Sequence, residues 1–150
     1  ATDAECDECD FEDSLWRRPA AKMKARRDHV SPLSVHATAM LKDLQCITGG
    51  GRYLCPHRSG KGFTTPNRLT YAMRDMNLGR GTTPHCWRTT FSTWANENGY
   101  RPDAIERQLA HVESNKVRAT YNKALLLDQR RTLLQDWANY LSAAEGSGTA

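Results

Sequence analysis

The chain has 150 residues, enough for one domain with a single hydrophobic core. Its formal net charge is +4, but residues 1–13 hold seven of the 17 acidic residues and no Lys or Arg, so residues 14–150 have a net charge of +11. No apolar run approaches the roughly 18 residues of a membrane span, so this sequence does not contain a membrane-spanning helix. A basic body of this kind suits a polyanion, and nucleic acid is the partner we expect.

Cysteine usage indicates a reducing compartment. The chain has five cysteines, an odd number, and no apolar segment that could act as a secretion signal. We therefore expect a cytoplasmic protein with free thiols and no membrane partner. The sequence also begins without a Met, and we expect it to be a fragment of a longer protein.

The N-terminal part predicts a small antiparallel sheet. Two short apolar segments, at residues 15–16 and 29–33, have the composition of strands, and a basic stretch at residues 22–27 joins them. A further short strand is predicted at residues 53–55, followed by a glycine-containing loop.

The rest of the chain predicts helices, because apolar residues recur there at spacings of three and four. Ser34 is a suitable N-cap, Pro66 and Pro84 suit first helical turns, and Gly99 suits a helix end. The predicted helices cover residues 35–48, 66–76, 84–98, 102–109, 115–124 and 126–141. On their expected apolar faces lie Ala37, Met40, Leu41 and Leu44, then Leu69, Ala72, Met73 and Met76, then Trp87, Phe91, Trp94 and Ala95.

These elements predict a mainly α fold with a small antiparallel β-sheet, an α+β domain. We expect this domain to occupy residues 1–142 and residues 143–150 to form a flexible tail.

A zinc site is the first chemical candidate. Cys6 and Cys9 form a C-x-x-C pair, and Cys55 with His57 offers a second pair of ligands. Structural zinc needs four ligands, usually in two regularly spaced pairs, and the second pair here is irregular. We favour buried thiols over zinc and expect no metal and no cofactor.

A stronger candidate is an ordered series of groups able to open a phosphodiester without a metal. A guanidinium and imidazoles can hold the phosphate oxygens, and a phenol can attack phosphorus once that charge is neutralised. Each residue alone has a simpler explanation, such as a Tyr packed on an amphipathic helix with its hydroxyl at the surface. The series consists of His85, Arg88, His111 and Tyr121.

In order and spacing this series resembles the catalytic half of the tyrosine recombinases, and more closely the prophage integrases of the satellite-phage type. The resemblance covers roughly residues 10–142 and is densest in segments 103–113 and 115–122. It implies a DNA breaking-rejoining fold and site-specific DNA integration through a 3′-phosphotyrosine intermediate. It also implies that the partner is double-stranded DNA at attachment sites. On that DNA we expect the protein to self-associate and to be associated with the nucleoid. Whether accessory DNA-bending proteins are needed stays open.

The resemblance also assigns roles to the residues of the series. Tyr121 is the nucleophile, and Arg88, His85 and His111 stabilise the phosphorane-like state. Lys24 matches a lysine carried on a β-hairpin, which gives a proton to the leaving 5′ oxygen.

The basic stretch leaves alternatives open. Lys22 is the second candidate for the general acid, and all the cations of this stretch could instead be contacts to backbone phosphates. The residues we expect to bind DNA are Lys22, Arg26, Arg27, Lys116 and Arg118.

The chain departs from the family pattern in one important respect. The family has another arginine, in a Thr-Gly-x-Arg-x-Gly-Glu pattern well before the lysine, and no such pattern is present here. Arg17 and Arg18 are too close to Lys24 to replace it. Losing one phosphate-clamping group costs about two to three orders of magnitude in rate, so we expect this chain alone to be weak or inactive. A smaller departure is Cys86-Trp87, where relatives have Gly-Phe.

Two other function classes are alternatives to a recombinase. One is a catalytically inactive DNA-binding fragment or prophage remnant, which the absent arginine would suit. The other is a metal-dependent nuclease, which is disfavoured because no carboxylate cluster lies near the His, Arg and Tyr residues.

Overall fold

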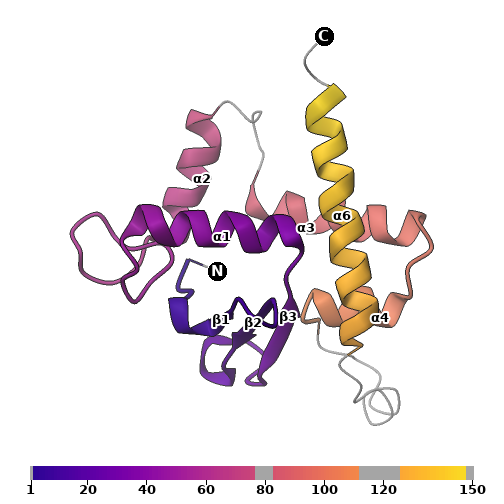
Figure 1. Ribbon diagram of the computed structural model, residues 1–150, viewed down its shortest axis with the longest axis horizontal. Helices are drawn as coiled ribbons and strands as arrows, with labels where there is room; N and C mark the ends of the chain where they lie inside the picture. The colour runs from indigo at the N-terminus through magenta and orange to yellow at the C-terminus, as the bar shows by residue number, and fades with distance from the viewer. Residues whose placement is uncertain (1, 77–82, 112–125, 148–150) are drawn as a thin grey trace.

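The computed structural model describes residues 2–76, 83–111 and 126–147 (Figure 1). Within these ranges the chain is mainly helical, with a three-stranded antiparallel sheet near its N-terminus, which confirms the expected fold class. The helix predicted at residues 115–124 lies outside the described residues. None of the described helices combines the length and the apolar character needed to cross a bilayer.

The sheet is built from β1 (Cys9–Asp10), β2 (Leu15–Arg18) and β3 (His29–Pro32), paired in that order. Strands β2 and β3 are the two strands predicted from the sequence. Two short 3₁₀ helices, η1 (Cys6–Glu8) and η2 (Ala20–Lys22), flank them. The β2–β3 register aligns Leu15 with Pro32 and Arg18 with His29, and the first of these pairs is buried.

The strand predicted at residues 53–55 is wrong. This segment makes only an isolated bridge, between Tyr53 and Glu5, because it meets the irregular N-terminal segment rather than a strand. The backbone N of Leu54 donates to the carbonyl O of Ala4 at 3.0 Å. A small apolar cluster forms at this contact, made of Ala4, Cys9 and Leu54, with Cys6, Phe11, Trp16, Leu41 and Leu44 packed against it.

Helix α1 (Val35–Thr48) begins and ends at the predicted signals. The Ser34 hydroxyl oxygen accepts from the backbone N of Ala37 at 3.1 Å, and the helix ends at Gly49, whose φ of 77° is left-handed. A second side chain caps the N-terminal end of α1, because the backbone N of Val35 donates to Oε1 of Gln135 at 2.9 Å. The start of α1 is therefore attached to the C-terminal helix.

The remaining described helices are α2 (Pro66–Asp75), α3 (Pro84–Glu97), α4 (Pro102–Gln108) and α6 (Leu127–Ser147). The first three each begin with the proline that predicted them. Helix α3 is followed by Gly99 in the left-handed conformation, as expected. Helix α6 continues past residue 142, and the division of the chain at that position stays a prediction.

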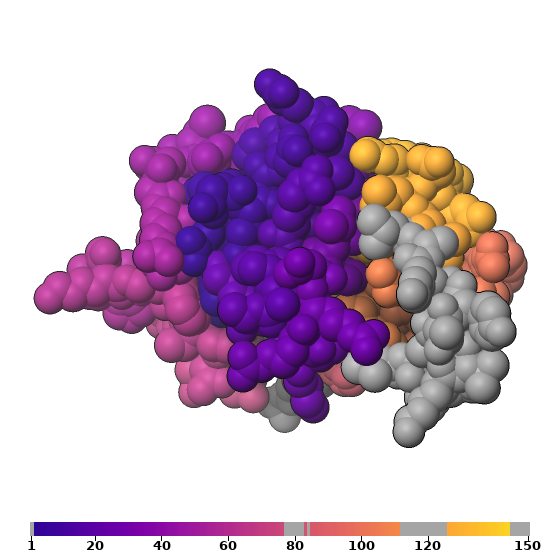
Figure 2. Space-filling model, turned by 90° about the horizontal axis from the view of Figure 1, so that it is seen from below, coloured from indigo at the N-terminus to yellow at the C-terminus, as the bar shows by residue number. Residues whose placement is uncertain are grey.

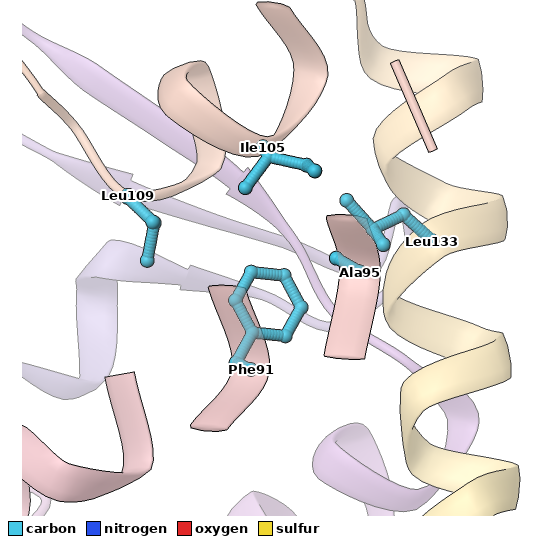
Figure 3. Close-up of a cluster of buried hydrophobic side chains, with 5 residues drawn as sticks. All are labelled: Phe91, Ala95, Ile105, Leu109 and Leu133. Carbon is cyan, nitrogen blue, oxygen red and sulfur yellow. The ribbon is translucent and has the colours of Figure 1, made fainter. Parts of the chain in front are cut away.

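The main core lies where α3, α4 and α6 meet (Figure 3). Ile105 and Leu133 are almost fully buried there, at 1% and 0% exposure. Helix α6 also packs against β3 and α1, so it contacts the sheet as well as the other helices (Figure 1). Five side chains form this core, namely Phe91, Ala95, Ile105, Leu109 and Leu133, with Trp94, Tyr100, Leu134 and Trp137 against them.

Truncating Leu133 tests this packing. Leu133→Ala is expected to lower the free energy of unfolding by about 3 kcal/mol, because it removes a fully buried side chain and leaves a cavity. Leu134→Ala is the matched control, since Leu134 is only partly buried, and about 1 kcal/mol is expected there. Urea unfolding followed by circular dichroism measures both. Equal losses at the two positions would contradict the core as described.

Candidate active site

Helix α3 carries the first two residues of the proposed series near its N-terminus. His85 is exposed, and Arg88, one turn later, is half-buried. Nη2 of Arg88 donates a hydrogen bond to the carbonyl O of Leu109, the residue that follows α4. This contact joins the start of α3 to the end of α4 and therefore brings Arg88 next to the turn that carries His111.

That turn orients His111. Ala110 adopts a left-handed φ of 52°, and the chain folds back so that the backbone N of His111 donates to the carbonyl O of Glu106 at 3.1 Å. Nδ1 of the ring lies 2.5 Å from Oε2 of the same glutamate. An ionised carboxylate can only accept, so Nδ1 is the donor in this contact, and Nε2 is left for another partner.

The proposed general acid lies on the β2–β3 connection, residues 19–28. The backbone N of Ala20 donates to Oδ1 of Asp28 at 2.8 Å, which joins the two ends of this segment. Lys24, Arg26 and Arg27 are exposed, and their side chains make no hydrogen bond or ion pair with another residue of the described ranges. They are therefore accessible to a ligand.

Lys22 is in a different situation. Its Nζ lies 2.6 Å from Oε1 of Glu5 and 2.5 Å from Oε1 of Glu8, and it donates to the carbonyl O of Asp3 at 3.2 Å. Burial lowers the pKa of Lys22, but the hydrogen bonds to the two carboxylates outweigh that effect, so the net shift is upward. Glu8 also accepts from Nε1 of Trp16 at 3.2 Å, so Glu8 connects Lys22 to strand β2.

The acidic N-terminal residues pair with the cations of the sheet and of the segment after α1. Asp3 accepts from Nη2 of Arg18 at 3.0 Å, and Glu5 accepts from Nε of Arg52 at 2.9 Å. Hydrogen bonds from Arg52 and from Lys22 lower the pKa of Glu5 to about 2. Several of the acidic residues concentrated at the N-terminus therefore form ion pairs with basic residues of the folded chain.

Sequence reasoning missed a buried polar junction between β3, α4 and α6. Arg130 is fully buried, and its Nη2 donates to Oε1 of Gln108 at 2.7 Å and to the carbonyl O of Val30 at 2.7 Å. Nε2 of Gln108 in turn donates to Oγ of Ser31 at 2.7 Å. A signal was available, because Arg130 occupies the same helical face as Leu133, where an apolar residue would be usual.

His29, at the start of β3, was also missed. Burial lowers its pKa, and the positive charges of four arginines lower it further, to about 4. The ring is therefore neutral near pH 7. In order of their effect on His29, these four residues are Arg130, Arg107, Arg18 and Arg88.

The structure thus brings part of the predicted site together. Arg88 and the His111 turn are in contact, His85 shares a helix with Arg88, and the segment that carries Lys24 leads into β3, which contacts α4 and α6. Figure 2 shows the N-terminal third of the chain at the centre of the face seen from below, with α6 beside it. The predicted nucleophile, Tyr121, lies outside the described residues, as do Lys116 and Arg118.

The sequence matches the model of the phage integrase family over residues 1–126. The chain belongs to this family. It is 40% identical to prophage integrase IntA of Escherichia coli (strain K12), in an alignment covering 97% of this chain and 35% of that protein. It is 41% identical to prophage integrase IntZ of the same strain and 38% identical to the integrase of Enterobacteria phage P4, each covering 92% of this chain and 35% of the relative.

The chain therefore spans about a third of the length of these relatives. No solved structure matches it. The family expected from the ordered His, Arg and Tyr residues is confirmed.

The cysteines of this integrase-family chain were the other chemical candidates. Burial raises the pKa of Cys9 to about 11, so its thiol stays protonated at neutral pH. Within the described ranges no three His, Cys, Asp or Glu side chains form a group that could hold a metal ion.

The neutral state of His29 predicts that acid weakens the fold. Its pKa in the folded state, about 4, lies below the ordinary value of 6.5, so the unfolded chain binds the proton first and stability falls as pH drops from 6.5 towards 4. After allowance for partial solvent exposure, we expect a loss of about 1–2 kcal/mol between pH 7 and pH 4.5 from this group.

Urea unfolding at both pH values measures this loss. His29→Gln cannot be protonated in this range and should show a smaller decrease than the unmodified chain. The same change at His57, which is exposed and not part of β3, is the control and should leave the decrease unaltered. An unchanged decrease in His29→Gln would contradict the assignment.

Proposed function

We propose that this chain forms the catalytic region of a tyrosine-type, site-specific DNA integrase, with residues 1–142 as its domain. The phenolic oxygen of Tyr121 attacks the scissile phosphorus, and the bond from phosphorus to the 5′ oxygen breaks. The phenolic proton passes to Nε2 of His111, and Lys24 donates a proton to the leaving oxygen. The products are a 3′-phosphotyrosine ester and a free 5′-hydroxyl, so the strand can later be rejoined.

Membership of the phage integrase family carries this proposal, and the contact between Arg88 and Leu109 supports it. The contact holds a guanidinium near an imidazole whose Nδ1 is already oriented by a carboxylate. Such a preorganised guanidinium stabilises the charge that develops on a phosphate in the transition state, and Nε2 of His111 can donate to the phosphate once it has taken the phenolic proton. His85 is the third group assigned to the phosphate.

The proposed partner is double-stranded DNA at attachment sites. Lys24, Arg26 and Arg27 suit this role because they are exposed cations without a partner among the described residues. Lys116 and Arg118 are proposed to contribute further phosphate contacts. Self-association on the DNA and help from DNA-bending proteins belong to the same proposal.

The contacts of Lys22 support Lys24 as the general acid. Lys22 is held by two carboxylates and by a backbone carbonyl, and its pKa is raised. Both properties oppose movement to a phosphate and release of a proton. We therefore assign the general acid to Lys24 and remove Lys22 from the residues proposed to contact DNA.

A nicked suicide duplex with the attachment sequence, incubated with the complete gene product, tests the proposal. A covalent protein–DNA adduct is expected, and Tyr121→Phe should reduce its formation by at least roughly a thousandfold while leaving DNA binding intact. Salt-sensitive binding without any adduct would instead support a passive DNA-binding module. The 150-residue chain alone should react about two to three orders of magnitude more slowly, because the further family arginine is not in its sequence.

The two lysines are separated by the same assay. Lys24→Ala is expected to slow adduct formation by about a hundredfold or more, the usual effect of losing a general acid. Lys22→Met should mainly lower stability, because it leaves Glu5 and Glu8 without their shared cation. The reverse pattern, with slow cleavage in a stable Lys22→Met variant, would transfer the assignment to Lys22.

A further inference from the structure

Two consecutive residues at the end of α4 hold the two halves of the proposed site. The side chain of Gln108 contacts β3 through Ser31 and α6 through Arg130. The carbonyl O of the next residue, Leu109, accepts from Arg88 of α3. The strand that follows the Lys24 segment and the helix that carries the phosphate-binding Arg88 are therefore joined through one short stretch of α4.

The side chain of Lys24 is exposed and makes no hydrogen bond or ion pair with another residue of the described ranges. Its reach towards a phosphate therefore depends on how firmly the ends of the β2–β3 connection are held. At the β3 end, Arg130 donates to the carbonyl O of Val30, and Gln108 donates to Oγ of Ser31. The other end is held by the pairing of Arg18 with Asp3.

We infer that Arg130 and Gln108 are positioning residues, which fix the Lys24 segment relative to the phosphate-binding groups of α3 and α4. The inference rests on the proposed function, since it concerns the step in which Lys24 protonates the leaving oxygen. Arg130 is fully buried, and burying a guanidinium is costly unless its donors are satisfied. Its hydrogen bonds to Gln108 and Val30 satisfy donors and at the same time determine the distance between α6, α4 and β3.

The consequence is a defect confined to one chemical step. Loss of the contacts of Gln108 should displace Lys24, while Arg88 stays in place because Ile105 and Leu109 still hold α4 in the core. Attack by the phenol and binding of the phosphate should continue, but proton delivery to the 5′ oxygen should fail. A misplacement of about 1 Å can reduce a rate by about a hundredfold.

The test uses two nicked duplexes that differ in one atom, with oxygen or sulfur at the bridging 5′ position. A thiolate leaves without a proton, because the pKa of a thiol is only about 8.5. Sulfur should therefore rescue any variant that lacks only proton delivery, including Lys24→Ala. The complete gene product is used throughout, and the rate of adduct formation, DNA binding and thermal unfolding are measured for each variant.

Gln108→Met keeps the length of the side chain and removes its bonds to Arg130 and Ser31. We expect it to slow adduct formation on the oxygen duplex by about 10- to 100-fold and to react within about threefold of the unmodified protein on the sulfur duplex. Ser31→Ala removes the hydrogen bond from Gln108 and the long one that Oγ of Ser31 donates to the carbonyl O of Pro32, but it leaves the contact between Gln108 and Arg130. It is the milder variant, with an expected loss of about three- to tenfold and the same rescue. It tests the inference even if Gln108→Met does not fold.

Gln135→Met is the matched control. Gln135 also joins two elements, because it caps α1 from α6, but it does not contact β3 or α4 through any hydrogen bond of the described residues. It should react like the unmodified protein on both duplexes.

Equal losses on the two duplexes for Gln108→Met and Ser31→Ala, or no loss on either, would overturn the positioning role and leave the proposed function standing. An unmodified protein that forms no adduct with either duplex, or an adduct that survives Tyr121→Phe, would overturn the proposed function and this inference with it.

Discussion

The buried guanidinium of Arg130 is the constraint on which the arrangement of this molecule depends. A charge of this kind is strongly disfavoured in an interior unless its donors are satisfied, and here they are met by Gln108 and by the β3 backbone at Val30. Burial, followed by the nearby charge of Arg107, lowers its pKa to about 10, so it stays cationic at neutral pH. Helix α6, helix α4 and the sheet can therefore pack together only in a geometry that brings these acceptors to the guanidinium.

The basic side chains on and near the sheet fall into two groups, those paired with carboxylates and those without such a partner in the described ranges. Arg18, Lys22 and Arg52 are paired with carboxylates of the N-terminal segment, and they stabilise the fold around the sheet. Lys24, Arg26 and Arg27 project from the same region without partners in the described ranges. The acidic residues therefore do not cancel the basic surface uniformly. They neutralise the structural cations, and the cations left over are concentrated on one connection, where a phosphate backbone can approach.

The sequence predicted β2, β3 and the starts of four helices, because these depend on local composition and on capping residues such as Ser34. It did not predict which apolar faces are covered. Met40, Met76 and Trp87 follow the helical period, yet they are 70%, 69% and 48% exposed, since periodicity identifies a face but not a partner for it. The candidate residues His85, Arg88 and His111 could be recognised from the sequence, because their order and spacing along the chain do not depend on the fold. The remaining features depend on contacts between residues far apart in the sequence and could not be predicted. They are the ion pairs of Lys22, the lowered pKa of His29 and the hydrogen bonds of the buried Arg130.

Helix α4 connects the stability of this molecule to its proposed chemistry. It has seven residues, too few for an isolated helix to persist in water, so its position comes from packing. Ile105 and Leu109 hold it in the core against Leu133 (Figure 3), while Gln108 and the carbonyl of Leu109 face β3 and Arg88. The apolar and polar contacts thus come from the same turns of one helix. A shift of this helix in the core would move both halves of the proposed site, and for this reason the packing of α4 and the geometry around Arg88 cannot vary independently.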